Sequence, residues 1–581
     1  MQLKTLWHAI AIGSAFAAAP VAAQTIYPIN RAEILEGSRF DFKVEFPNAP
    51  ASADVAVTIN GKPAAETFGK PTTFMQSEEG QKHSALWLRG ATLPAGNYVV
   101  EATQGANKAT VKWEVFATAQ PRRARNVILF VGDGMSVAHR TAARILSKGW
   151  EEGRYNGELA MDDMSNMALI STSGSDSVVT DSANAAHAYT TGHKSCVNAL
   201  GVYCAKNALT LDHPKVETIS EVIKRRNKMA IGVVTNSEIE DATPASMVAH
   251  TRRRSDFNDI VKMFHEVQPD VIMGGGSPNF LPKTTPGSKR TDDLDFIAKF
   301  KDAGYALATT KAEMNAAVAG GSKKLLGLYN TSNIDGAFDL RLAKKGSTGK
   351  FPDQPDVVEQ TKAAIDMLKG NEDGFFLMVE SARIDKYSHS LDWERSVFDT
   401  IMLDNAVKVA KDFAGERNDT LIIVVADHAH PVSIIGTYDD ERPGQLLRDK
   451  LGVYAESVPP NYGPLDAQGY PTNVDTSRRL AVVFGSYPDT CDIGRPSMGG
   501  ERVPAVKGPD GKTNIANEAD CSGPLATRKA GNLPFDSNTG VHSADDVVLT
   551  AMGPGAEKFR GHKPNTYVFR VMAEALALGG K

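Results

Sequence analysis

The sequence predicts an α/β fold, with a mainly parallel central sheet flanked by helices, preceded by a small all-β sandwich domain. Two patterns along the 581-residue chain support this prediction. Up to about residue 119, apolar residues alternate with polar ones, which is the period of strands buried on one face. After residue 120, apolar residues come in continuous runs between helical segments, a pattern typical of parallel strands buried on both faces.

The first 23 residues have the features of a secretory signal peptide. Lys4 precedes an apolar run over residues 9–19, and the small residues Val21-Ala22-Ala23 follow that run. We expect cleavage after Ala23 and an exported protein, periplasmic or extracellular. The run is too short to span a bilayer, and no later stretch suits a transmembrane segment. The net charge of −5 gives no electrostatic signature of a nucleic-acid-binding module.

Residues 24–119 form the predicted sandwich, an accessory domain that we expect to be immunoglobulin-like. Apolar residues alternate with charged ones from Phe40 to Phe46, and a second alternating run from Val55 to Ile59 leads into Asn60-Gly61, a hairpin-turn dipeptide. Short alternating strands with turns between them are typical of such sandwiches. Nothing in this part points to catalysis, so a packing or spacing role is preferred to ligand binding.

Residues 120–581 form the predicted second and larger domain, which begins after a short linker. Its expected strands are five continuous apolar runs, over residues 127–131, 229–234, 271–273, 375–379 and 421–426. Three of them lead directly to an acidic residue: Asp133, Glu380 and Asp427. Ligands of open α/β sheets bind outside the carboxyl ends of the strands. These three carboxylates are therefore expected at one site.

A stretch at about residues 431–539 interrupts this rhythm with many Pro, Gly, Asp and Asn residues, and we interpret it as an insertion tied by a disulfide. The four cysteines of the chain fall into two local pairs, Cys196/Cys204 and Cys491/Cys521. In an exported protein these pairs are the favoured disulfides, although the sequence alone permits three connectivities. A zinc site of four cysteines is the weaker alternative, because no CxxC spacing is present.

Ser182 follows Asp181 at the expected start of a helix that ends at Gly192. The free N–H groups and the dipole of a helix N-terminus favour an anion at this place. The plainer interpretation is helix capping, since Asp and Ser are common N-cap residues.

Residues of the types that bind metal ions occur at several places in the larger domain. Asp385 and His389 are four residues apart, so they share one face of a helix and can approach one metal ion together. Asp427-His428 adds two ligands at a strand end, and Asp133 adds one at another. Imidazole with carboxylate suits zinc, whereas oxygen-only ligands suit magnesium.

At these residues the chain closely resembles the alkaline phosphatases. The resemblance covers about residues 124–580, excludes the sandwich, and rests on five blocks in the family's order: Gly132–Met135, Asp181-Ser182, Asp241–Pro244, Glu380–His389 and Asp427-His428. It implies an alkaline-phosphatase-like fold. It also implies hydrolysis of a broad range of phosphate monoesters through a covalent phosphoserine on Ser182, with release of inorganic phosphate.

The resemblance further implies two zinc ions and one magnesium ion. One zinc would be held by Asp385, His389 and His542. The second zinc would be held by Asp133, Asp427 and His428, with the Ser182 oxygen as a further ligand. The magnesium site would combine Asp241, Thr243, Glu380 and the shared Asp133.

Four residues of this implied site need comment. His542 departs from the family pattern, because Ser543-Ala544 follows it where the family usually has Thr-Gly, and His430 and His562 are alternatives. Arg254 matches the arginine that clamps phosphate, with Arg252 and Arg253 as competing candidates. A planar guanidinium can grip two phosphate oxygens at once. Asp241 and Lys386 match the bacterial pattern, in which Lys386 would place a positive charge near the phosphate.

Two rival functions stay open. A phosphodiesterase, sulfatase or phosphonate hydrolase could use the same fold, but Ser182-Ala183-Asn184 lacks the sulfatase context and a diesterase usually has a threonine nucleophile. The distant alternative is a non-catalytic secreted binding protein. Many family members are homodimers, so a homodimer is a candidate state, although the extra domain could block or replace that interface.

Overall fold

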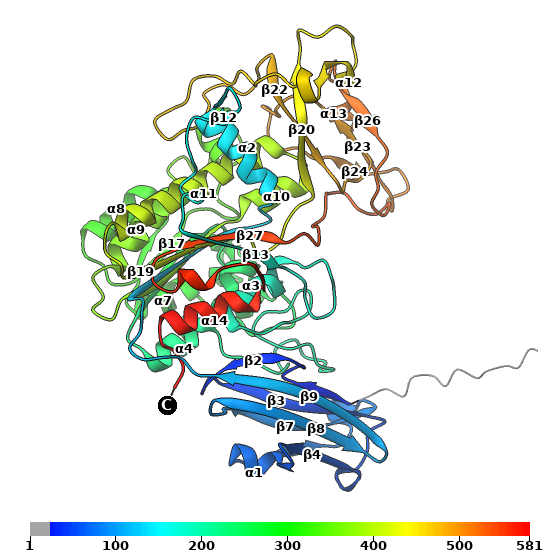
Figure 1. Cartoon of the computed structure of the whole chain (residues 1–581), viewed down its shortest axis with the longest axis vertical. Helices are drawn as coiled ribbons and strands as arrows, with labels where there is room; N and C mark the ends of the chain where they lie inside the picture. Colours follow the sequence, from blue (N-terminus) through cyan, green and yellow to red (C-terminus); the bar gives the residue numbers. More distant parts are fainter. Residues whose placement is uncertain (1–23, 581) are drawn as a thin grey trace, which may run out of the picture.

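The computed structural model describes residues 24–580, so the predicted signal peptide over residues 1–23 lies outside the described residues (Figure 1). Among the described helices, none is both long and apolar enough to cross a membrane.

The N-terminal part consists of two sheets that enclose one apolar core. The first sheet has the order β1 (Thr25–Tyr27), β3 (Phe40–Pro47), β7 (His83–Ala91) and β6 (Thr73–Met75), and the second has the order β2 (Ala32–Leu35), β9 (Asn107–Phe116), β8 (Gly96–Gln104), β4 (Val55–Ile59) and β5 (Lys62–Pro63). One short helix, α1 (Ala64–Phe68), interrupts the strands. The prediction of an all-β part is thus confirmed in part.

In β3, the alternating pattern predicts the burial of the apolar residues but not that of the charged residues between them. Its apolar residues from Phe40 to Phe46 are buried in the core between the two sheets, as the pattern predicts. The charged residues between them, Asp41, Lys43 and Glu45, are also buried, because residues 203–217 of the larger domain cover that face. The division of the chain near residue 119 remains a prediction, since these two parts pack into each other.

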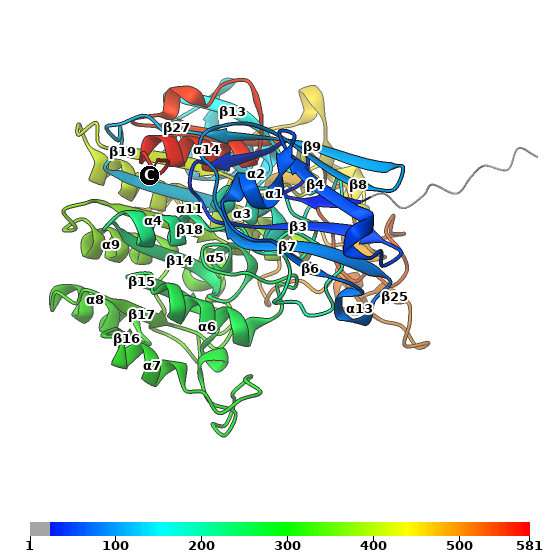
Figure 2. The same cartoon turned by 90° about the horizontal axis from the view of Figure 1, so that it is seen from below.

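The larger part is built on a ten-stranded mixed sheet with the order β16-β17-β15-β14-β18-β10-β19-β27-β13-β28. Figure 2 labels the strands of this sheet from β27 to β16, apart from β10. Five strands correspond to the predicted apolar runs: β10 (Asn126–Gly132), β14 (Ala230–Glu238), β15 (Val271–Gly275), β18 (Phe375–Ser381) and β19 (Thr420–Val425). The others are β13 (Asn166–Ser171), β16 (Ala306–Ala308), β17 (Leu325–Leu328), β27 (Val547–Met552) and β28 (His562–Pro564).

All neighbours from β16 to β19 pair in parallel, and only β27 runs antiparallel to its two neighbours. Helices cover both faces, which is what strands that are apolar on both sides require (Figure 1). One face carries α2 (Val137–Lys148), α9 (Val357–Leu368) and α11 (Trp393–Ala414), and the other carries α3 (Ser182–Thr191), α4 (Ile219–Arg226) and α14 (Thr566–Ala575). The predicted α/β fold class is confirmed.

Shorter elements complete this part. They are the two-stranded ribbon of β11 (Trp150–Glu151) and β12 (Arg154–Tyr155), and the helices α5 (Ala242–Ala245), α6 (Phe257–Val267), α7 (Phe296–Asp302), α8 (Lys311–Ala319) and α10 (Arg383–His389).

Residues 431–539 form three small sheets beyond α2 and α10, at the top of Figure 1. The strands are β20 (Val432–Asp439), β21 (Leu451–Gly452), β22 (Arg478–Phe484), β23 (Thr490–Asp492), β24 (Ala505–Lys507), β25 (Asn514–Ala516) and β26 (Thr527–Lys529), and the helices are α12 (Leu447–Lys450) and α13 (Glu518–Cys521). Disulfides join Cys491 to Cys521 and Cys196 to Cys204, so the predicted pairing is confirmed and the four-cysteine zinc site is excluded.

A buried ion network fastens this insertion to the start of α11. The Arg395 guanidinium, fully buried, donates two hydrogen bonds of 2.8 and 2.9 Å to the Asp339 carboxylate and one of 2.7 Å to Asp392. It also donates to the backbone carbonyl of Ser497 in the insertion, at 2.8 Å. One arginine therefore pairs with two buried carboxylates, and it holds two parts of the chain together.

We expect Arg395→Met to lower the free energy of unfolding by about 3–5 kcal/mol, because it removes the cation that pairs with both buried carboxylates. The matched control is Arg417→Met: Arg417 is half exposed and 3.8 Å from Asp419, so its loss should change stability by only about 0–1 kcal/mol. Urea unfolding of both variants gives the comparison. Equal stability of the two variants would contradict this account of the network.

Candidate active site

Three strand ends bring the predicted carboxylates together. Strand β10 lies between β18 and β19 in parallel register, with Val131 opposite both Glu380 and Val425. Asp133 follows the end of β10, Glu380 is the last residue but one of β18, and Asp427 follows β19. All three carboxylates are buried at one edge of the sheet, as the sequence predicted.

Ser182 is the first residue of α3, and its hydroxyl points at this edge. The Ser182 Oγ donates to Asp133 Oδ1 at 3.3 Å and lies 3.2 Å from His428 Nε2. The capping function belongs to the preceding residue, because an Asp181 carboxylate oxygen accepts the N–H of Asn184 at 3.2 Å. The Ser182 hydroxyl therefore does not cap the helix, as the capping interpretation allowed, and it is available for another role.

Asp133, Asp427 and His428 form the first candidate metal group, with ligand atoms within 4.8 Å of one another. His428 Nε2 is 3.1 Å from Asp133 Oδ1 and 3.5 Å from Asp427 Oδ2. The Asp427 Oδ2 atom is buried and has no hydrogen-bond partner among residues 24–580. A buried carboxylate oxygen without a partner is costly, and a bound cation would remove that cost. This set fits zinc.

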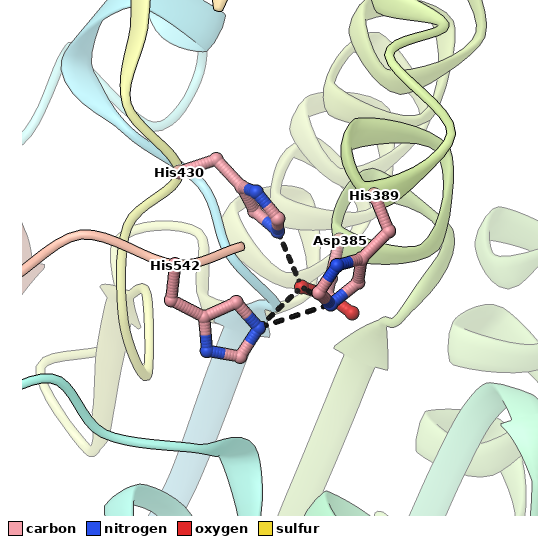
Figure 3. Close-up of side chains that lie close together, drawn as sticks. All are labelled: Asp385, His389, His430 and His542. Carbon is pink, nitrogen blue, oxygen red and sulfur yellow. Dashed lines mark hydrogen bonds and ion pairs between the residues drawn. The ribbon is translucent and has the colours of Figure 1, made fainter. Parts of the chain in front are cut away.

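Asp385, His389, His430 and His542 form the second candidate group (Figure 3). Two histidines use Nδ1–H to donate to a backbone carbonyl: His389 to Gly540 at 2.6 Å and His542 to Thr180 at 2.8 Å. This leaves their Nε2 atoms 3.0 Å apart, facing each other and Asp385. Metal-binding histidines are held by such bonds to their other nitrogen. This set also fits zinc.

His430 differs from these two histidines in its contacts. Its Nε2 lies 2.6 Å from Asp385 Oδ1, while its Nδ1 is buried without a partner. An Nε2–H that donates to Asp385 cannot bind a metal, so this geometry assigns His430 to the support of Asp385. His562, the other alternative for His542, is exposed and lies 3.4 Å from Asp546.

The residues of the predicted magnesium site fit a cation less directly than the two zinc groups do. Asp241 is the N-cap of the short helix α5, on which Thr243 is buried. The two oxygens of Asp241 accept from Lys386 at 2.6 Å and from Arg254 at 2.7 Å. The neighbouring Glu380 accepts hydrogen bonds from Thr235 and Ser237 on β14. Oxygen ligands for magnesium are present, but Asp241 is already neutralised by two cationic side chains.

Of the three consecutive arginines, only Arg254 reaches this site. Its guanidinium bridges Asp241 and Asp181, the latter at 3.3 Å. Arg252 donates to the backbone carbonyl of Val197, and Arg253 is largely exposed and pairs with Asp256. Although burial acts against it, Asp241 and its acidic neighbours raise the pKa of Arg254 and bring the pKa of Lys386 to about 12. Both groups stay cationic.

Crowded carboxylates dominate the electrostatics of the site. Burial and the neighbouring Asp385 raise the pKa of Asp133 from 3.8 to about 7. Burial and Asp133 raise the pKa of Glu380 from 4.5 to about 8, and the pKa of Asp427 is raised for the same reasons. Without cations, this cluster holds protons that an unfolded chain would have lost. The site therefore requires positive charge to be ionised at neutral pH.

A pH dependence of stability follows for metal-depleted protein. Carboxyl groups with raised pKa values stabilise the fold at low pH, and this contribution is lost as pH rises through the folded-state values near 7 and 8. Burial lowers the pKa of His428 and His430, so these groups oppose the trend up to their ordinary value of 6.5. We expect the melting temperature of chelator-treated protein to fall between about pH 6.5 and pH 8, and zinc with magnesium to reduce that fall. Calorimetry at each pH, with and without the metals, measures the melting temperature. The same pH slope in both samples would contradict this account.

Sequence reasoning missed several residues of the site. Thr235 and Ser237 donate to Glu380, yet neither belongs to a recognised motif. Asp181 was recognised as an N-cap, but its ion pair with Arg254 was not expected. The only signal was position: Thr235 and Ser237 follow the apolar run of β14, where that strand reaches the same sheet edge.

Comparison with known proteins agrees with the motifs. The alkaline phosphatase family model matches residues 124–578. The alkaline phosphatase of Escherichia coli (strain K12) is 33% identical over 367 residues, which are 57% of this chain and 75% of that protein. Streptomycin-6-phosphate phosphatase of Streptomyces griseus is 32% identical over 411 residues, 63% of this chain and 86% of the relative.

Solved structures show the same fold. The crystal structure of Thermus thermophilus alkaline phosphatase superposes with a TM-score of 0.55 at 22% identity, covering 80% of this chain and 94% of that one. The family model spans the whole larger part, including every candidate site residue. The chain belongs to the alkaline phosphatase family.

Proposed function

We propose that this chain hydrolyses phosphate monoesters through a covalent phosphoserine on Ser182, on a site with two zinc ions and one magnesium ion. The observation that carries the proposal is the place of Ser182 Oγ, 3.3 Å from Asp133 and 3.2 Å from His428 at the N-terminus of a buried helix. A serine hydroxyl is a weak nucleophile on its own and needs activation by its surroundings.

The proposed hydrolysis has two steps, and each site residue has a separate role in them. Ser182 Oγ gives up its proton to solvent water and attacks the phosphorus. The bond to the ester oxygen breaks, and the leaving alkoxide takes a proton from water. Water then attacks the phosphoserine, which releases inorganic phosphate and restores the hydroxyl. Arg254 and the free N–H groups of α3 hold the non-reacting phosphate oxygens, and Lys386 adds positive charge nearby.

The metals would be held by the three residue sets described above. Asp385, His389 and His542 would bind one zinc, and Asp133, Asp427 and His428 would bind the other, with Ser182. Glu380, Thr243, Asp241 and Asp133 would form the magnesium site. When bound, the ions neutralise developing negative charge and lower the pKa of coordinated hydroxyl groups.

Turnover of p-nitrophenyl phosphate, measured beside bis-p-nitrophenyl phosphate and p-nitrophenyl sulfate, tests the reaction class. We expect the monoester to be hydrolysed much faster than the other two. Exhaustive chelation should abolish this activity, and zinc with magnesium should restore it. Faster diester or sulfate hydrolysis, or full activity without metals, would overturn the proposal.

Substrate range and location are parts of the same proposal. The proposed contacts address the phosphate group, so monoesters of unrelated alcohols should react at similar rates, which a substrate panel can show. Two formed disulfides support export to the periplasm or the cell exterior. A homodimer remains a candidate state, to be measured by light scattering of the full chain.

A further inference from the structure

The N-terminal sandwich holds the larger part of the chain through a buried charged contact. Lys43 on β3 is fully buried and donates to Glu45 at 2.7 Å and to Asn207 at 2.8 Å. Glu45 in turn accepts the backbone N–H of Lys206 at 2.7 Å. We call residues 203–217 the docking segment. Its charged contacts are desolvated and specific, so it is held in one position against the sandwich.

Apolar contacts reinforce this attachment. Tyr203 and Val216, from the two ends of the docking segment, are part of the apolar core of the sandwich. Val216 also pairs with Phe40 as an antiparallel bridge. The Tyr27 hydroxyl donates to the backbone carbonyl of Cys204 at 2.8 Å. The sandwich therefore fixes both ends of the docking segment.

The docking segment continues from a short loop that the Cys196–Cys204 disulfide closes. We call residues 196–204 the disulfide loop. Its Gly201 N–H donates to His187 Nδ1 on α3 at 2.8 Å. Gly201 has a φ of +60°, and a Cβ there would lie 2.0 Å from the carbonyl oxygen of Ala249, so only glycine fits. The loop is thus packed directly against the helix that begins with Ser182.

Asn198, in the disulfide loop, contacts the phosphate-clamping arginine by two routes. Its carbonyl accepts the backbone N–H of Arg254 at 2.9 Å. Its own N–H donates to Asp181 Oδ2 at 3.2 Å, and the same oxygen accepts from the Arg254 guanidinium. Asn198 has a φ of +69°, a conformation that the closed loop imposes. Both the backbone and the head of Arg254 thereby depend on the loop.

We propose that the sandwich and the disulfide loop position Arg254 for phosphate binding, with Asn198 as the positioning residue. This inference rests on the proposed function, because it assigns the accessory domain a role in that reaction. The path runs from Lys43 and Tyr27 through the docking segment to the loop, and from Asn198 to Arg254.

Opening the loop tests the proposal in the full chain. We expect the double variant Cys196→Ala, Cys204→Ala to raise the KM for p-nitrophenyl phosphate and the inhibition constant of inorganic phosphate about tenfold, with a much smaller change in kcat. The matched control is Cys491→Ala, Cys521→Ala, which removes the disulfide of the insertion. It should leave both constants unchanged.

A second variant covers the case in which the loop variant fails to fold. Asn198→Val places a β-branched residue at a positive φ and should raise the same two constants. Asn48→Val imposes the same kind of strain at an exposed turn of the sandwich, where Asn48 has a φ of +62°, and should raise neither.

The decisive measurement repeats both loop variants in the Arg254→Ala background. A positioning role predicts no further loss of phosphate affinity there, whereas a general structural role predicts losses that add. Unchanged phosphate affinity in the loop variants, or additive losses, would overturn the inference. An inactive wild-type enzyme would instead overturn the proposed function.

Discussion

Replacement of Ser182 by alanine is expected to lower kcat for p-nitrophenyl phosphate by roughly 10³-fold or more, the scale seen when a catalytic nucleophile is removed. The variant lacks the only hydroxyl that lies between Asp133 and His428 at the start of α3. Stability should change little, because the capping bond of that helix comes from Asp181. The activity loss is therefore expected without loss of the fold.

Acid quenching during turnover of labelled phosphate monoester measures the intermediate directly. Wild-type protein should carry acid-stable label on Ser182, and Ser182→Ala should carry none. Ser175→Ala is the matched control, since Ser175 is an exposed serine in the preceding loop and makes no side-chain hydrogen bond there. Labelled phosphate found on another residue would contradict the assignment of Ser182 as the nucleophile.

The second large effect distinguishes His542 from His430. His542→Ala should remove one zinc ion per chain and most of the activity, because His542 presents a free Nε2 beside His389 and Asp385. His430→Ala should keep the zinc content and cost about 10- to 100-fold in activity or metal affinity, as is typical for a residue that supports a ligand.

Metal analysis of dialysed samples, with turnover measured on the same samples, decides between the two histidines. Far-UV circular dichroism of both variants checks that the fold is kept. If His430→Ala lost the zinc and His542→Ala kept it, the ligand set would have to be reassigned.

The fold and the central site could be predicted because local patterns report on them. Continuous apolar runs mark strands buried on both faces, and an acidic residue after such a run must lie at the sheet edge where the runs end. Asp133, Glu380 and Asp427 were found in this way. The family motifs then supplied Ser182 and Arg254, whose places in the fold agree with that edge.

The position of His430 and the burial of Lys43 depend on contacts between distant parts of the chain, which no local sequence pattern encodes. The sequence offers His430 only as an alternative to His542, and β19 ends before it, at Val425. The loop after β19 nevertheless brings His430 back, and its N–H donates to the carbonyl of Gly134. In the sandwich, the alternating pattern predicts that Lys43 is exposed to solvent. A segment 164 residues away in sequence helps to bury it, with Asn207 at the contact.

The docking segment has a consequence for how the protein matures. Two contacts of β3 reach the docking segment: Phe40 forms a bridge with Val216, and Lys43 donates to Asn207 in addition to Glu45. As the chain emerges N-terminus first, at about 5–20 residues per second, the sandwich waits several seconds after its own last strand for these residues to arrive. During that interval its charged face is open, so the domain that comes first in sequence is completed late. We expect truncation before Val216 to leave it prone to proteolysis, whereas a chain extended beyond the docking segment protects it.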